Sequence, residues 1–83
     1  MWHVYILACG DGTLYTGITT DVPARLEAHR MGKGAKYTKG RGPLELVYRE
    51  AVGSKSEATK REAAIKRMGR AEKLGLVGNP TPE

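Results

Sequence analysis

The sequence predicts a small α+β domain, in which a three-stranded antiparallel sheet is flanked by helices in the order β-β-α-β-α-α. Three observations support this class. Two strand-like segments are joined by Gly10-Asp11-Gly12, a third alternating segment covers residues 43–52, and helical patterns lie on either side of that third segment. With 83 residues the chain is short enough for one domain, which we expect to span residues 1–78, followed by a flexible tail at 79–83.

The first two strands are predicted to form a hairpin. Residues 2–9 (WHVYILAC) alternate between two faces, residues 13–18 (TLYTGI) return, and the intervening glycines favour a turn. A two-residue loop would place Tyr5 and Tyr15 on opposite faces of the hairpin. A three-residue loop at residues 10–12, or a bulge, brings both tyrosines to one face. A shared active site requires this second geometry.

The first helix follows the hairpin. Thr20 or Asp21 caps it, Pro23 occupies its first turn, and it runs to about Met31 before Gly32 stops it.

Residues 30–41 (RMGKGAKYTKGR) hold five basic residues, three glycines and no acid, so we expect a mobile basic loop. Residues 43–52 (PLELVYREAV) then form the third strand, in which alternation places Leu44, Leu46 and Tyr48 against Glu45, Val47 and Arg49.

The second helix begins at Ser54 or Ser56 and continues to about Met68. Gly69 breaks the pattern, and a short last helix covers residues 70–77.

Composition favours an anionic partner inside the cell. The formal net charge is +5, which points first to nucleic acid, although many small basic domains bind nothing specific. The single cysteine, Cys9, permits no intramolecular disulfide and fits a reducing, cytoplasmic setting. No apolar run approaches the roughly 18–20 residues of a membrane span, and the start of the chain lacks the pattern of a signal peptide.

Glu62 is the sharpest candidate for chemistry. Helical spacing places it four residues after Ala58 and three before Ile65, along the predicted buried stripe. A carboxylate there needs a partner or a metal ion. The alternative is a marginal position with an ion pair to Lys66, one turn further on. Glu57 is the other carboxylate, but it lies near the helix start, where an acid favours the helix dipole.

Arg25 and His29 lie one turn apart on the first helix, next to its apolar residues. Arginine suits phosphate oxygens, and histidine can donate to a phosphate or act as an acid or base near neutral pH. Tyr5 and Tyr15 can orient or deprotonate a water, although a phenol with a pKa near 10 is a poor base at pH 7. The alternatives are an ordinary amphipathic helix and half-buried packing tyrosines.

Basic side chains in the loop and near the C-terminus can line a phosphate track, and Tyr37 can stack on a base. The alternative is a solvated surface that keeps the protein soluble. The basic candidates are Lys33, Lys36, Lys39 and Arg41 in the loop, and Lys60, Arg61, Lys66, Arg67, Arg70 and Lys73 further on.

Taken together, the chain resembles the GIY-YIG nuclease superfamily, in particular its small stand-alone bacterial members and the UvrC N-terminal domain. The first motif reads VYI and the second YTG, and both keep the tyrosine. The resemblance covers residues 2 to about 77 and rests on VYIL at 4–7, LYTGITTDVPARLEAH at 14–29, GKGAKYTKGRGPLELVY at 32–48 and EATKREAAIKR at 57–67.

The resemblance implies an endonuclease or nickase that cuts DNA with one divalent cation, Mg²⁺ or Mn²⁺, in repair or nucleic-acid turnover. By position, Tyr5 and Tyr15 match the motif tyrosines, Arg25 the phosphate-contacting arginine and Glu62 the metal ligand. His29 matches a position that assists the chemistry. We favour Tyr15 as acceptor of the water proton with Tyr5 positioning it, although the sequence does not separate the two.

Two further expectations complete the interpretation. Because no second recognition module is visible, we expect a preference for single-stranded or branched DNA over a specific sequence. The competing hypothesis is a nucleic-acid-binding module that keeps the fold with little or no catalysis.

Overall fold

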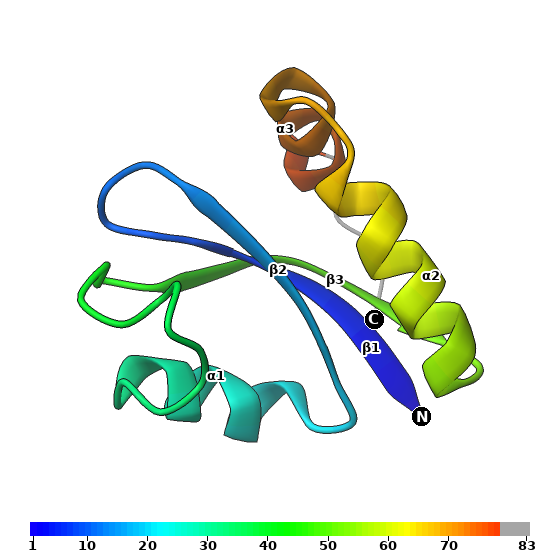
Figure 1. Ribbon diagram of the computed structural model, residues 1–83, viewed down its shortest axis with the longest axis horizontal. Coiled ribbons are helices and arrows are strands. Elements are labelled where there is room, and N and C mark those ends of the chain that lie inside the picture. The colour runs from blue at the N-terminus through cyan, green and yellow to red at the C-terminus, as the bar shows by residue number, and fades with distance from the viewer. Residues whose placement is uncertain (79–83) are drawn as a thin grey trace.

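The computed structural model describes residues 1–78 and confirms the predicted α+β order. Its elements are β1 (Trp2–Ala8), β2 (Leu14–Thr19), α1 (Val22–Arg30), β3 (Glu45–Val52), α2 (Lys55–Lys66) and α3 (Arg70–Gly78). The strands form one antiparallel sheet in the order β2-β1-β3, with α1 on one face and α2 on the other (Figure 1). The expected tail, 79–83, lies outside the described residues. Within the described part of the chain, none of the helices has the length and apolar character that a membrane crossing requires.

The hairpin adopts the three-residue loop, so both motif tyrosines lie on one face of the sheet. Tyr5 pairs with Gly17, and Tyr15 pairs with Leu7. Gly12 has a φ of +87°, a left-handed conformation that glycine adopts without strain, and it lets the loop close after Gly10 and Asp11. The register that a shared site requires is confirmed.

Strand β3 corrects one expectation from the alternation pattern. Leu46 pairs with Leu7 but Tyr48 pairs with Ile6, because the pairing shifts by one residue between these positions. Val47 is the extra residue of this bulge. Leu46 and Tyr48 therefore face opposite sides of the sheet, whereas strict alternation placed them on the same side.

The helices begin at side-chain caps. Asp21 accepts a hydrogen bond from the Ala24 amide at 3.1 Å, and Ser54 accepts one from the Glu57 amide at 3.1 Å. Of the two candidates offered for each helix, Asp21 and Ser54 are therefore the caps. Helix α1 ends at Arg30 with Met31 as its C-cap, and the chain reverses at Gly32, whose φ of +77° is left-handed.

The core lies between the sheet and α2. Its buried members are Val4, Ile6, Tyr48, Ala58 and Ile65, which come from β1, β3 and α2. Met68 and two residues of α3 pack against its edge, so the stripe predicted on α2 is confirmed. This arrangement leaves the opposite face of β1, with Tyr5 and Leu7, to α1 and the loop that follows α1.

A polar contact fixes α2 against β3. The Tyr48 hydroxyl donates to Glu50 Oε1 at 2.6 Å, and Arg61 Nε donates to both carboxylate oxygens of Glu50 at 3.0 and 3.2 Å. Glu50 holds the pKa of Arg61 above its ordinary value, while burial and then the bond to Glu50 raise the pKa of Tyr48. Arg61 is therefore engaged within the fold, although the sequence offered it for a phosphate track.

We expect Arg61→Gln to lower the free energy of unfolding by about 1 kcal/mol, because it removes a partly buried ion pair. Lys60→Gln is the matched control on the neighbouring exposed position and should change little. Urea denaturation of both variants measures the difference. Equal stabilities would show that the Arg61–Glu50 contact does not hold α2 in place.

Candidate active site

The site is built around a buried hydrogen bond between β1 and α1. The Tyr5 hydroxyl lies 2.7 Å from His29 Nε2, and the two residues are 2% and 1% exposed. Periodicity placed His29 beside the apolar stripe of α1, and the structure buries it as deeply as Val22. Burial raises the pKa of Tyr5, whereas burial and then the charge of Arg25 lower the pKa of His29. Both side chains are therefore held in their neutral forms.

Tyr15 completes an aromatic group on the same face. Its ring centroid lies 6.4 Å from that of Tyr5 and 5.2 Å from that of His29, with the His29 ring edge-on. Gly17 makes this grouping possible, because a Cβ there would lie 2.5 Å from the Tyr5 hydroxyl oxygen. The glycine of the second motif thus leaves room for the tyrosine of the first.

Arg25 lies beside the Tyr5 hydroxyl and tends to lower the Tyr5 pKa against the effect of burial. One terminal nitrogen of Arg25 donates to the Gly34 carbonyl at 3.1 Å. Its Nε is buried and has no hydrogen-bond partner among residues 1–78. A buried donor in this state favours an anionic ligand that brings an acceptor.

Glu62 approaches the same group from α2. Its charge contributes to raising the Tyr5 pKa, after burial and Tyr15, so it acts on the site from the opposite element. The side chain is 22% exposed and pairs with Lys66 at 3.4 Å. The ion pair between Glu62 and Lys66, which the sequence offered as the alternative to a metal ligand, is therefore present in the structure. Glu57, the other candidate, instead accepts from the Gly53 amide at 3.1 Å near the helix start.

No group of three or more His, Cys, Asp or Glu side chains gathers as a metal cluster in the described chain. A carboxylate oxygen of Glu62 is the donor that a hard cation such as Mg²⁺ prefers, and such a cation keeps most of its ligands as water. The partly buried Glu62, whose ion pair is with an exposed lysine, thus fits a single-carboxylate site.

The segment after α1, expected as a mobile basic loop, forms a series of turns that pack on α1 and the hairpin. Thr38 is 1% exposed, and the amide of Gly10 donates to the Arg41 carbonyl at 2.6 Å. Lys33, Lys36 and Lys39 point from these turns as exposed side chains. The predicted loop lysines are thus displayed close to the site.

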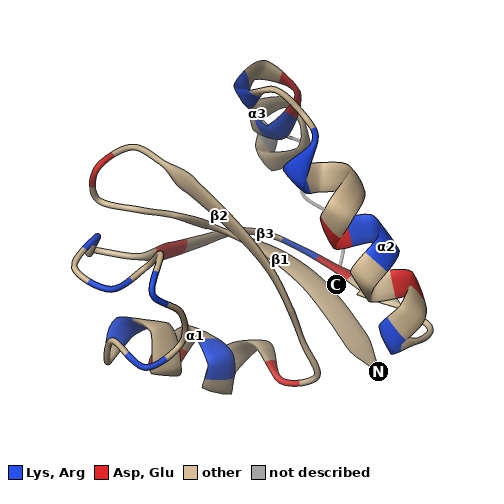
Figure 2. Cartoon of the chain, viewed as in Figure 1, with Lys and Arg blue, Asp and Glu red and all other residues tan. Residues whose placement is uncertain are grey.

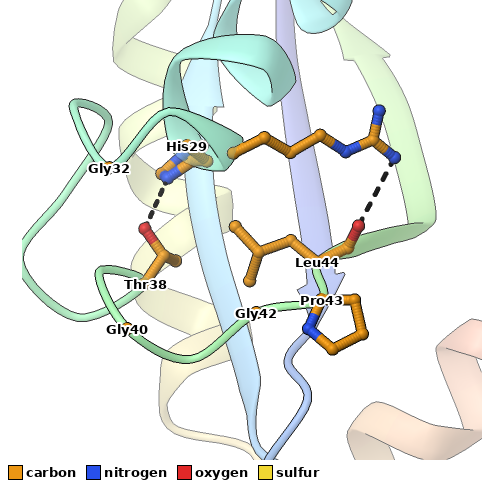
Figure 3. Close-up of a pocket in the computed structure, with 8 residues that line it drawn as sticks. His29, Gly32, Thr38, Gly40, Gly42, Pro43 and Leu44 are labelled. Atoms are coloured by element: carbon orange, nitrogen blue, oxygen red, sulfur yellow. Dashed lines mark hydrogen bonds between the residues drawn. The ribbon is translucent and has the colours of Figure 1, made fainter.

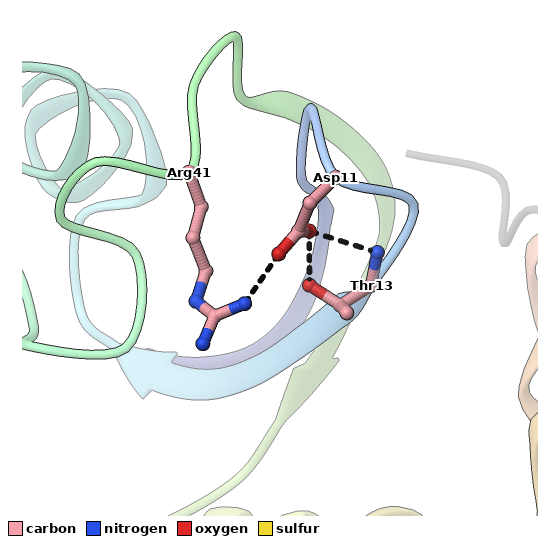
Figure 4. Close-up of polar contacts among 3 residues, drawn as sticks. All are labelled: Asp11, Thr13 and Arg41. Atoms are coloured by element: carbon pink, nitrogen blue, oxygen red, sulfur yellow. Dashed lines mark hydrogen bonds and ion pairs between the residues drawn. The ribbon is translucent and has the colours of Figure 1, made fainter.

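Tyr37 and Arg41 are engaged with the site. Tyr37 stacks on Tyr15 with centroids 5.7 Å apart, and the Arg41 guanidinium covers the Tyr37 ring at 4.3 Å from its centroid. Arg41 also forms an ion pair with Asp11 in the hairpin loop (Figure 4). Bonds from Thr13, first from its hydroxyl, hold the pKa of Asp11 below its ordinary value, with Arg41 adding to the effect. Stacking of a base on Tyr37 stays a prediction that requires Arg41 to move.

The remaining basic candidates lie on the other side of the sheet. Figure 2 shows Lys and Arg gathered on α1 with its following loop, and separately along α2 and α3. In the second group Lys66, Arg67 and Arg70 are exposed and Lys73 is partly buried. Glu62 lies beside this group, so the two basic regions flank the site from opposite faces.

Three contributors were missed by sequence reasoning. Thr38 bonds to His29, Asp11 pairs with Arg41, and Gly34 packs so closely that a Cβ there would lie 2.4 Å from His29 Nδ1. Each contact joins residues nine or more positions apart, or depends on the path of an irregular loop. No periodicity could indicate it.

A comparison with models of protein families identifies the family of this chain. A model described as the GIY-YIG catalytic domain matches residues 1–74. This is a nuclease-type family, and the chain belongs to it.

Small proteins called UPF0213 are similar over most of their length. The chain is 54% identical to a UPF0213 protein from Halobacterium salinarum over 76 residues. The aligned region covers 92% of this chain and 99% of that protein. A solution NMR structure of a UPF0213 protein from Bacillus halodurans superposes with a TM-score of 0.60 at 52% identity, covering 94% of this chain and 84% of that chain. A solution NMR structure of a protein from E. faecalis gives a TM-score of 0.61 at 37% identity, covering 98% and 90%.

We expect Gly17→Ala to lower the free energy of unfolding by about 1–3 kcal/mol, because the added methyl group overlaps the Tyr5 hydroxyl. Gly75→Ala is the matched control. A Cβ at Gly75 meets nothing within 4 Å, so alanine should stabilise α3 by up to about 1 kcal/mol. Urea denaturation measures both. A Gly17→Ala variant as stable as the wild type would contradict the close approach of Tyr5.

The lowered pKa of His29 predicts a loss of stability on acidification. The unfolded state takes up the proton first, so the stabilisation is complete above the ordinary histidine pKa near 6.5 and is lost as pH falls toward the folded value. The slope is limited to about 1.4 kcal/mol per pH unit. Tyr5, Tyr15, Arg25 and Thr38 are the side chains that face the ring.

Urea unfolding at pH 7.5, 6.5 and 5.5 measures this slope. His29→Gln, the control, should be less stable at pH 7.5 and should show a flatter dependence on pH. A wild type and a variant with the same pH dependence would show that His29 is not held neutral by the fold.

Proposed function

We propose that the protein is a divalent-metal-dependent DNA endonuclease or nickase that acts in the cytoplasm, in DNA repair or turnover. The observation that carries this proposal is the convergence of charged and polar groups on the Tyr5 hydroxyl. His29 bonds to it, and Arg25, Tyr15 and Glu62 all influence its pKa. These groups come from β1, β2, α1 and α2, and a merely structural tyrosine has no need of them.

Arg25 would bind the scissile phosphate. Its guanidinium is held at one end by the Gly34 carbonyl, and its buried Nε lacks an acceptor among the described residues. A phosphate oxygen would supply that acceptor, and the fixed charge would stabilise the negative charge that grows as the phosphodiester bond breaks.

Glu62 would hold one Mg²⁺ or Mn²⁺ ion through its carboxylate. When bound, such an ion acts as a Lewis acid toward the phosphate and offsets charge on the leaving oxygen. Lys66 would give up its 3.4 Å contact with Glu62, a modest loss because this exposed i,i+4 pair contributes about 0.3–0.5 kcal/mol. Lys66 would then be free for a backbone phosphate.

The tyrosines would position the attacking water and take its proton. The two side chains lie on one face of the hairpin, and the Tyr5 hydroxyl lies next to Arg25, so a water could meet both the phosphate and a phenol oxygen. The basic side chains on both sides of the sheet would bind the DNA backbone, the loop lysines on one side and Lys66, Arg67, Arg70 and Lys73 on the other. Such contacts read backbone shape and charge, which favours single-stranded or branched DNA over a sequence.

The second candidate is a nucleic-acid-binding module with little or no catalysis. The observation that favours it is that several site residues contact one another and so are covered or paired. Arg41 covers Tyr37, Tyr37 covers Tyr15, and Lys66 neutralises Glu62. In this interpretation the same basic surfaces bind DNA but no water is activated.

Glu62→Ala decides between the two functions. We expect it to reduce metal-dependent cleavage of labelled DNA by about 100-fold or more, since one carboxylate holds the metal, while DNA binding stays within about threefold. Glu57→Ala, the matched carboxylate on the same helix, should keep cleavage. Single-stranded, duplex, flap and branched DNA are compared with Mg²⁺ and with Mn²⁺.

Two results would count against the enzyme. Tight binding by both proteins with no cutting of any substrate favours the binding module. If Glu62→Ala retains cleavage and Glu57→Ala loses it, the carboxylate that holds the metal is Glu57 and not Glu62.

A further inference from the structure

A chain of hydrogen bonds runs from Tyr5 into the loop after α1. The Tyr5 hydroxyl lies 2.7 Å from His29 Nε2, and His29 Nδ1 lies 2.8 Å from Thr38 Oγ1. The Thr38 hydroxyl in turn donates to the Ala35 carbonyl at 3.1 Å. Tyr5, His29 and Thr38 are each at most 2% exposed. The three side chains are therefore almost entirely covered by the rest of the protein.

The last hydrogen bond of the series, from Thr38 to Ala35, determines which group donates in each of the others. A carbonyl oxygen only accepts hydrogen bonds, so Thr38 uses its single hydroxyl proton on Ala35. Thr38 Oγ1 must then accept from His29, which places the imidazole proton on Nδ1. In the neutral ring Nε2 is left with a lone pair, and Tyr5 has to be the donor in the bond between them.

We propose that Thr38 is a positioning residue that fixes His29 as its Nδ1–H tautomer and so makes Tyr5 and His29 a one-directional proton relay. The relay rests on the nuclease function proposed above. As the attacking water loses a proton to the Tyr5 oxygen, the Tyr5 hydroxyl proton passes to His29 Nε2. One O–H bond breaks in the water and one forms on Tyr5, while the original Tyr5 O–H bond is replaced by N–H on His29.

The relay removes an obstacle to phenol catalysis. A free phenolate is rare at neutral pH, and burial raises the pKa of Tyr5 further. Transfer to His29 lets Tyr5 accept a proton without first losing one. It also separates the two tyrosines, because the Tyr5 hydroxyl forms the hydrogen bond with His29 Nε2, whereas Tyr15 contacts His29 through its ring, at 62° between the two ring planes. Tyr5 is thus the proton acceptor and Tyr15 the positioning tyrosine, the reverse of the preference drawn from the sequence.

A pocket next to the relay explains why Thr38 is needed. It has a volume of about 130 Å³ and is lined by both His29 and Thr38, together with residues that include Gly40 and Leu44 (Figure 3). Water in this pocket could replace a missing Thr38 hydroxyl at His29 Nδ1. Water both donates and accepts with equal ease, however, whereas Thr38 is committed as an acceptor by Ala35. Without Thr38 the ring would populate both tautomers.

Imidazole ¹⁵N chemical shifts test the tautomer without reference to catalysis. We expect long-range ¹H–¹⁵N spectra of the full chain at pH 7.5 to show His29 as the Nδ1–H tautomer. His3→Gln assigns the signals, because the chain has two histidines. In Thr38→Val we expect both tautomers and a cleavage rate lower by about tenfold to 100-fold, within the range of general acid–base effects. Thr38→Ser should restore both observables to near wild type.

Thr16→Val is the matched control. Thr16 is also a buried threonine, at 3% exposure, but its hydroxyl has no hydrogen-bond partner among the described residues and it lies on the α2 face of the sheet. In Thr16→Val, the ¹⁵N spectrum of His29 and the cleavage rate should equal those of the wild type.

Each other outcome overturns a defined part of the proposal. If His29 of the wild type is the Nε2–H tautomer, or a mixture of both tautomers, Thr38 does not fix the tautomer, whatever the activity. This measurement uses the wild type alone, so it does not depend on a variant that folds. A tautomer shift in Thr38→Val with unchanged cleavage overturns the relay. If the wild type cuts no DNA, the proposed function fails and the relay with it, while the spectra still decide whether Thr38 fixes the tautomer.

Discussion

The buried hydrogen bond between the Tyr5 hydroxyl and His29 Nε2 is the contact on which the site depends. It links the central strand to α1 across the face of the sheet that the main core leaves uncovered. A polar group left without a partner at this depth would destabilise the fold by about 1–3 kcal/mol. The fold therefore has to hold α1 and the hairpin in one relative position. That same position brings Arg25 and Tyr15 to the Tyr5 hydroxyl.

Two glycines show how closely this contact is packed. Gly17 on β2 and Gly34 in the loop each occupy a place where a Cβ would overlap the Tyr5 hydroxyl or the His29 ring. One lies on the strand beside Tyr5 and the other beyond His29, so backbone approaches the pair from two sides. The loop carbonyl at Gly34 also receives the Arg25 guanidinium. Loop, helix and hairpin are thus positioned by one small cluster of side chains.

The sequence predicts the parts of this arrangement that depend on local patterns. The glycines at 10–12 permit the three-residue loop that places both tyrosines on one face, and the spacing of Ala58 and Ile65 places Glu62 along their stripe, with the ion pair to Lys66 as the alternative. The bulge at Val47 breaks an alternation that looks regular in the sequence. The partners of Thr38 and Arg41 depend on how an irregular loop folds over α1, and no residue period reports that path.

The charges around His29 connect substrate binding with proton transfer. In the free protein, burial and the positive charge of Arg25 both oppose protonation of His29, so the pair rests in its neutral form. A phosphodiester bound against Arg25 would bring a negative charge close to the guanidinium and cancel much of its effect on the ring. Transfer of the Tyr5 proton would then become less unfavourable only once the substrate is in place. If Arg25 binds the phosphate as proposed, it would also keep the relay inactive until DNA is bound, a coupling that the placement of Arg25 and His29 one turn apart on α1 allows.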